Sequence, residues 1–87
     1  MHLQNRILDI LNQLDPEEVT DVQINRRNKF VTVTCSLSFD RADKWEVVGA
    51  TLHIDITDDD ILPDDDDDGF TMAVINGERI AHLKEAA

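Results

Sequence analysis

A strictly alternating stretch from Val31 to Asp40 limits the folds open to this 87-residue chain more than any other feature. Apolar side chains occupy its odd positions and polar ones its even positions: Val31, Val33, Cys35, Leu37 and Phe39 against Thr32, Thr34, Ser36, Ser38 and Asp40. Successive side chains of a β-strand point to opposite faces, so this period of two predicts a strand rather than a helix. Because only one face is apolar, the strand belongs in an antiparallel sheet with one buried and one wet face.

Two further segments alternate on either side of this strand. Val22 and Ile24 indicate a short strand before it, joined by a turn over residues 26–28 in which Asn28 is able to take a positive φ. A long strand from Trp45 to about residue 57 follows the charged turn at residues 40–44. Its apolar phase changes parity near Gly49, which predicts either a bulge there or a Trp45 side chain on the outer face.

The N-terminal segment predicts an amphipathic helix over residues 2–14. Its apolar residues recur at spacings of three and four, and they are Leu3, Ile7, Ile10, Leu11 and Leu14. The Asp15-Pro16 pair is expected to end the helix, because the residue before a proline avoids the helical conformation.

The C-terminal segment is open to two interpretations. Phe70, Met72 and Val74 alternate before Asn76-Gly77, a dipeptide typical of tight hairpin turns. We therefore expect a hairpin that places Phe70 opposite Leu83. The alternative is a terminal helix over residues 78–86, which its composition allows.

These elements predict a single α+β domain over residues 1–87, with an acidic loop at residues 58–69. The N-terminal amphipathic helix packs on a four- or five-stranded antiparallel meander sheet, with enough chain for one modest core. The single cysteine, Cys35, excludes an intramolecular disulfide and is expected to lie buried in a protein of a reducing compartment. We find no signal peptide and no apolar stretch of about 18 residues, so a cytoplasmic protein is expected.

Nine aspartates fall within the 14 residues from Asp55 to Asp68, which we call the acidic segment. The chain has 19 acidic and 8 basic residues and a net charge of −11, whereas the 10 acids and 8 bases outside this segment give only −2. Two carboxylates about 6 Å apart in water repel by roughly 0.7 kcal/mol, so the run does not stabilise the fold by itself. It is either a solvated loop or a surface for a cationic partner, and its charge argues against direct binding to nucleic acid or an anionic membrane.

Two details of the acidic segment and its surroundings bear on binding. Ile61, Leu62 and Pro63 interrupt the aspartates, and an apolar anchor within a charged rim is typical of a binding surface. The basic cluster Arg26, Arg27 and Lys29 is either a soluble turn, a second contact point, or an internal counter-charge for the aspartates.

No residue pattern indicates catalysis or a cofactor. Three scattered glycines form no phosphate-binding loop, and no nucleophile stands beside a base, so we expect a protein that is not an enzyme. His53 and Asp55 lie two apart without an evident third metal ligand. The run Asp64, Asp66, Asp68 and Gly69 matches the first half of an EF-hand loop, but Ile75 stands where the bidentate glutamate belongs, so we expect no dedicated metal site.

In its length, its pI of about 4.3 and its aspartate runs at 58–60 and 64–68, the chain resembles the small acidic DNA-mimic inhibitors of phages and mobile elements. These include anti-CRISPR and anti-restriction proteins, and the resemblance covers composition and architecture. It implies an inhibitor that acts in the bacterial host cytoplasm if phage-encoded, by occupying the basic DNA channel of a nuclease or CRISPR effector. Immunity proteins, which neutralise basic nuclease toxins, share these features.

We therefore expect a non-enzymatic acidic binding protein, monomeric or a small homo-oligomer, that blocks a basic nucleic-acid-binding protein without a cofactor. The predicted partner-binding residues are Asp55, Asp58, Asp59, Asp60, Ile61, Leu62, Asp64, Asp65, Asp66, Asp67, Asp68 and Trp45. The alternative is a structural or adaptor subunit whose aspartate run is a solvated loop.

Overall fold

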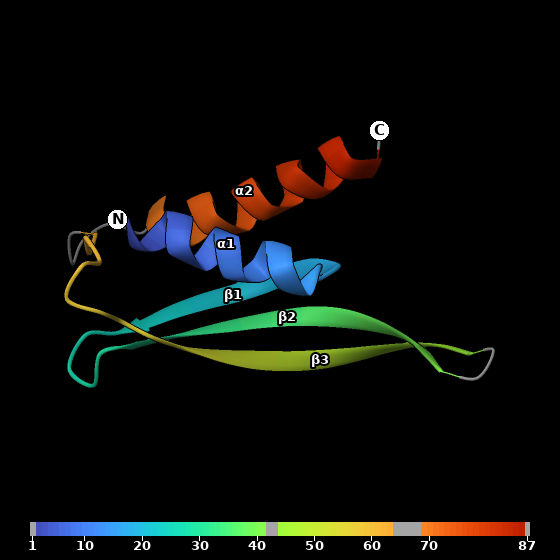
Figure 1. Cartoon of the computed structure of the whole chain (residues 1–87), viewed down its shortest axis with the longest axis horizontal. Helices are drawn as coiled ribbons and strands as arrows, with labels where there is room; N and C mark the ends of the chain where they lie inside the picture. Colours follow the sequence, from blue (N-terminus) through green and yellow to red (C-terminus); the bar gives the residue numbers. More distant parts are fainter. Residues whose placement is uncertain (1, 42–43, 64–68, 87) are drawn as a thin grey trace.

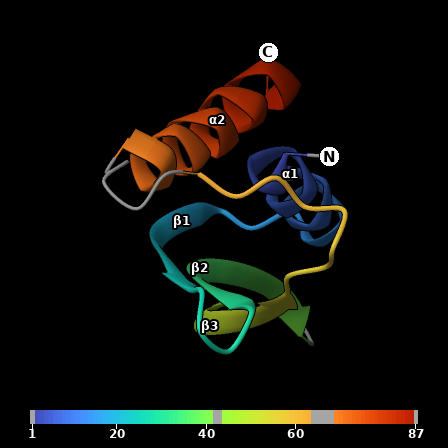
Figure 2. The same ribbon diagram turned by 90° about the vertical axis from the view of Figure 1, so that its left-hand side faces the viewer.

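The computed structural model describes residues 2–41, 44–63 and 69–86, and their side chains except at positions 41, 44 and 80–86. Helices α1 (Leu3–Leu14) and α2 (Gly69–Ala86) accompany a sheet of β1 (Glu18–Asn25), β2 (Phe30–Arg41) and β3 (Lys44–Asp55). Both helices lie on the same side of the sheet, and its other face is uncovered (Figures 1 and 2). The α+β class is confirmed, but the described residues form three strands rather than the predicted four or five.

The sheet is an antiparallel meander in the order β1-β2-β3, as predicted. β2 and β3 pair without interruption from Phe30 opposite Asp55 to Arg41 opposite Lys44, so the predicted bulge at Gly49 is wrong. Because side chains alternate in an unbroken register and Ile54 is buried, the odd-numbered residues of β3 face away from the helices. Trp45 therefore lies on the outer face, as in the alternative interpretation. The register shift lies instead in β1, between Val19 and Asp21.

The core fills the space between the two helices and the inner face of the sheet. Leu3, Ile7 and Leu11 of α1 are fully buried there. They belong to one cluster with residues of all three strands and of α2, namely Val19, Val22, Val31, Val33, Cys35, Ile54, Phe70, Val74 and Ile75. Burial, followed by the nearby charge of Glu78, raises the pKa of the Cys35 thiol, which keeps it protonated at neutral pH.

Two local predictions can be compared with the backbone. α1 ends at Leu14 as expected, and Asp15 takes a left-handed conformation (φ 48°) with its N–H donating to the Leu11 carbonyl at 2.9 Å. In the β1–β2 turn, the positive φ belongs to Lys29 (φ 58°), so its assignment to Asn28 is wrong. Asn28 instead donates its N–H to the side chain of Asn25 at 3.0 Å, which stabilises the turn.

The C-terminal hairpin is also wrong, because residues 69–86 form α2. Phe70, Val74 and Glu78 are buried and recur every four residues, which is the spacing of one helix face, whereas Met72 is 52% exposed. The turn preference of Asn76-Gly77 is local and small. Burying an apolar helix face against the core outweighs it.

Replacing Gly77 with alanine tests this assignment. A Cβ at Gly77 would meet only the end of the flexible Leu8 side chain, at 3.4 and 3.7 Å. Since glycine costs a helix interior about 1 kcal/mol relative to alanine, we expect Gly77→Ala to raise the free energy of unfolding by about 0.5–1 kcal/mol in urea denaturation. A type I′ hairpin turn would require a positive φ at this position, so destabilisation by the same change would contradict the helix.

Candidate acidic binding surface

The acidic segment leaves the end of β3 and leads to α2, and we call its described part, residues 55–63, the acidic connection. It passes the N-terminus of α1 and the β1–β2 turn at one end of the molecule (Figures 1 and 2). The N–H of Ile56 donates to the Lys29 carbonyl at 2.9 Å, and the N–H of Leu3 donates to the Ile61 carbonyl at 3.3 Å. His2 and Ile61 form a parallel bridge. Backbone hydrogen bonds at both ends therefore hold the connection against the folded body.

An ion pair with α1 anchors the middle of the connection. The Arg6 guanidinium lies 2.7 Å from the Asp60 carboxylate, whose side chain is only 1% exposed. Asp60 also accepts hydrogen bonds from the N–H of Thr57 at 2.8 Å and from its hydroxyl at 3.1 Å. Arg6 donates in addition to the backbone carbonyl of Asp55, so a single side chain fixes both ends of the turn.

This environment changes the acidity of Asp60. Burial alone would raise its pKa, but the hydrogen bonds from Thr57 and Arg6 and the positive charge of Arg6 together lower it. Asp60 is therefore held as a carboxylate by the protein itself. Among the predicted partner-binding residues that the structure describes, Asp60 is the one directed inward.

The neighbours of Asp60 in the connection are directed outward. Asp58 and Asp59 are exposed at the corner of the turn, and the Asp55 side chain is 82% exposed. Ile61 and Leu62 follow at 54% and 39% exposure. Exposed carboxylates and an exposed apolar pair thus share one surface. The predicted residues Asp64 to Asp68 lie outside the described residues.

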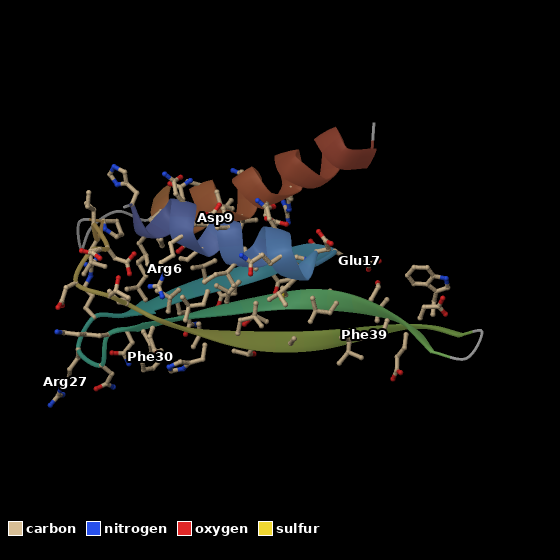
Figure 3. All side chains as sticks on the ribbon, viewed as in Figure 1. Arg6, Asp9, Glu17, Arg27, Phe30 and Phe39 are labelled. Carbon is tan, nitrogen blue, oxygen red and sulfur yellow. The ribbon has the colours of Figure 1, made fainter. Side chains whose placement is uncertain are left out.

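Trp45 does not share this surface. It is 76% exposed, but it pairs with Asp40 at one end of the β2–β3 hairpin, whereas Asp55 pairs with Phe30 at the other. Ten residues of extended chain separate Trp45 from Asp55, which corresponds to roughly 33 Å. Phe30 and Phe39 mark these two ends in Figure 3.

The basic β1–β2 turn lies beside the acidic connection. Arg26 donates to the Pro63 carbonyl, and Arg26 and Lys29 line a hollow of about 230 Å³ together with Asp58 and Asp60. Arg27 is exposed and points away from the molecule (Figure 3). This placement favours the interpretation of Arg26 and Lys29 as internal counter-charges. The role of Arg6 was not predicted, because no local pattern links it to residue 60.

A second hollow, of about 460 Å³, lies on the other side of the connection. His2, Gln4, Ile61, Leu62 and Phe70 are among the residues that line it. The wall is mixed, with apolar side chains from three segments and polar groups from the start of α1. It offers room for a side chain of a partner next to the exposed aspartates.

A contact between His53 and Asp55 lies at the same end of the molecule. His53 lies 3.2 Å from the Asp55 carboxylate and stacks on Phe30 with ring centroids 4.4 Å apart, and both His53 and Asp55 are exposed. Within residues 2–41, 44–63 and 69–86, no three His, Cys, Asp or Glu side chains gather as metal ligands. Over the same part of the chain, no helix is long and apolar enough to cross a membrane.

Comparisons of the chain with protein-family models, with curated proteins and with solved structures found no match.

Proposed function

We propose that this protein is a non-enzymatic acidic binding protein that blocks a basic, nucleic-acid-binding partner, such as a nuclease or a CRISPR effector, by presenting DNA-like negative charge. The observation that carries the proposal is the anchored acidic connection. Asp60 is turned inward onto Arg6, while Asp58 and Asp59 stay exposed beside Ile61 and Leu62. A loop kept only for solubility needs neither the internal anchor nor the exposed apolar pair.

The charges and the exposed fractions of these side chains assign different roles to the acidic segment and to the apolar pair Ile61 and Leu62. The acidic segment supplies a long-range negative field that accelerates encounter with a basic groove and weakens as salt increases. Arg6, Arg26 and Lys29 offset part of this charge, but they are three bases against nine aspartates. Ile61 and Leu62 add the apolar contact that charge alone does not supply, with the hollow of about 460 Å³ beside them. A DNA channel or the surface of a nuclease toxin presents the matching positive field.

We test the proposal with two variants of equal charge change. In the first, Asp64 to Asp68 become serine; in the second, five exposed acids elsewhere become amides, namely Asp9, Asp15, Glu17, Asp40 and Glu46. Tagged proteins are incubated with host lysate at low salt, and bound protein is eluted with duplex DNA. We expect the unmodified protein and the second variant to retain a DNA-eluted partner and the first to lose it, with on-rates lower by about tenfold or more. Equal recovery with both variants, or a partner that DNA does not elute, contradicts the proposal.

An adaptor role is the second candidate, because one observation outside the acidic surface favours it. Four large apolar side chains are exposed on the part of the β2–β3 hairpin that extends past β1: Phe39, Trp45, Val47 and Val48. Phe39 and Val48 lie on the helix-facing side of this hairpin and Trp45 and Val47 on the other, so both of its faces offer apolar contacts to a partner. In an adaptor, the partner would be recovered by the serine variant and lost on substitution of this hairpin.

A further inference from the structure

The outer edge of β3 is a long pairing surface. β3 runs for 12 residues at the edge of the sheet, and the helices lie toward β1 and away from β3 (Figure 2). An edge strand exposes a row of N–H and C=O groups that are able to pair with another strand. Proteins usually protect such edges with prolines, bulges or charged side chains. β3 contains no proline, its register with β2 is unbroken, and its charged residues, Lys44, Glu46 and Asp55, lie near its two ends.

Two exposed apolar residues stand on the outer face of this strand. Trp45 is 76% exposed and Val47 is 60% exposed, and their odd positions place them on the same side. They pair with Asp40 and Ser38, in the portion of the β2–β3 hairpin that extends past β1, whose last partner in β2 is Ser36. Tryptophan buries roughly 150–250 Å² when covered, so leaving it in water is costly.

Gly49 completes the pattern on the same face. It has no positive φ, and a Cβ at this position would meet nothing within 4 Å. Neither the backbone conformation of Gly49 nor its packing against the described residues therefore requires a glycine. Glycine weakens a strand interior and often marks a place where another group approaches the backbone closely.

We propose that two copies of this chain pair along β3, antiparallel, about a two-fold axis at Val47. In this register Trp45 of each copy lies opposite Gly49 of the other, and the two Val47 side chains meet at the axis. Residues directly opposite share a face, so the tryptophan ring covers the open glycine backbone, an arrangement that stabilises strand glycines. The result is a continuous six-stranded sheet with the apolar outer-face residues mutually covered.

Charge and packing disfavour two alternative registers. An axis at Glu46 would bring two carboxylates directly opposite each other, and an axis at Gly49 would place two glycines together without a side-chain contact. With the axis at Val47, Asp55 lies eight residues away on each side, so the two acidic connections are roughly 50 Å apart. Their repulsion is screened at that distance, since the Debye length is about 8 Å at physiological salt.

Sedimentation and fluorescence together test the dimer, because Trp45 is the only tryptophan in the sequence. We expect twice the chain mass at high concentration, and dilution should release monomer while shifting the Trp45 emission to the red. Gly49→Val places a side chain in the space that the Trp45 ring of the other copy would occupy. It should therefore weaken self-association at least about tenfold. The valine also favours the strand, so thermal unfolding will show that the variant is folded. Met72→Ser removes an apolar side chain on α2 that is 52% exposed and should leave the dimer intact.

A chain mass that stays monomeric at high concentration overturns the inference, as does a dimer that Gly49→Val does not weaken. The dimer surface and the acidic surface lie at opposite ends of β3, so their tests are independent. A folded Gly49→Val monomer that still captures the DNA-eluted partner would leave the proposed function in place, and loss of that partner by the serine variant would leave the dimer unaffected.

Discussion

Leu11→Ala is expected to lower the free energy of unfolding by about 3 kcal/mol. Leu11 is completely buried between α1 and the sheet, so alanine removes apolar contacts and leaves a cavity that the surrounding core fills only in part. A domain of this size loses roughly 4–8 °C in melting temperature per kcal/mol, which predicts a fall of about 12–24 °C. Circular dichroism measures the first quantity in urea denaturation and the second in thermal unfolding.

The same helix supplies the control. Leu14 lies three residues further on and is 45% exposed, so Leu14→Ala removes the same atoms from a site that water already reaches. We expect Leu14→Ala to lower the free energy of unfolding by less than about 1 kcal/mol. Equal losses for the two variants would mean that α1 does not pack on the sheet as described.

Leu11 and Leu14 together also indicate how far the periodicity of the sequence predicts burial in α1. Spacings of three and four placed Leu3, Ile7 and Leu11 in the core, and all three are buried. The same pattern included Leu14, but a helix face is buried only where a neighbouring element covers it. At Leu14 the helix ends and the chain turns at Asp15, so the last position of the stripe stays half exposed. Local sequence predicts the stripe, whereas tertiary packing decides its length.

In the C-terminal segment, the local pattern predicted the wrong type of secondary structure. Residues 70, 72 and 74 alternate as in a strand, and Asn76-Gly77 supplied the turn, yet the spacing of four between Phe70, Val74 and Glu78 was also present. The hairpin was favoured because of the Asn76-Gly77 turn dipeptide, whereas the spacing of four includes a charged residue, a type that is rarely buried. Glu78 is buried all the same, at 2% exposure. Turn propensity is worth about 1 kcal/mol, and burial of the α2 face is worth several times that.

Some features of the candidate site could likewise be predicted from local sequence, and others depend on the assembled fold. Composition alone located the acidic segment and its apolar interruption, and Ile61 and Leu62 are indeed exposed. The inward turn of Asp60 had no local signal, because its partner Arg6 lies 54 residues away. Arg6 faces this turn because α1 is packed on the sheet, so the contact depends on the assembled fold. Trp45 was grouped with the acidic residues as an interface aromatic, and only the strand register reveals that it lies at the other end.

Arg6→Met should destabilise the protein by about 2–3 kcal/mol. Methionine keeps much of the apolar stem but removes the guanidinium, so that among the described residues the N–H and the hydroxyl of Thr57 remain as donors to the buried Asp60 carboxylate. The Arg6 side chain is 26% exposed, which places the cost at the lower end of the range for buried ion pairs. Arg27→Met is the matched control, since Arg27 is exposed at the hairpin tip, and we expect a change within about 0.5 kcal/mol.

The cause of the Arg6→Met effect can be identified from the pH dependence of the difference in free energy of unfolding. The pKa of Asp60 is lowered in the folded protein relative to its ordinary value of about 3.9 in the unfolded chain. The pair therefore contributes its full stability above that ordinary value, and the contribution is lost as the pH falls through the lower folded pKa. We expect the difference between the original protein and Arg6→Met to be constant from about pH 5 to pH 8 and to shrink below about pH 4. A difference that persists unchanged in acid would assign the effect to lost packing of the arginine stem and not to the ion pair that anchors the acidic connection.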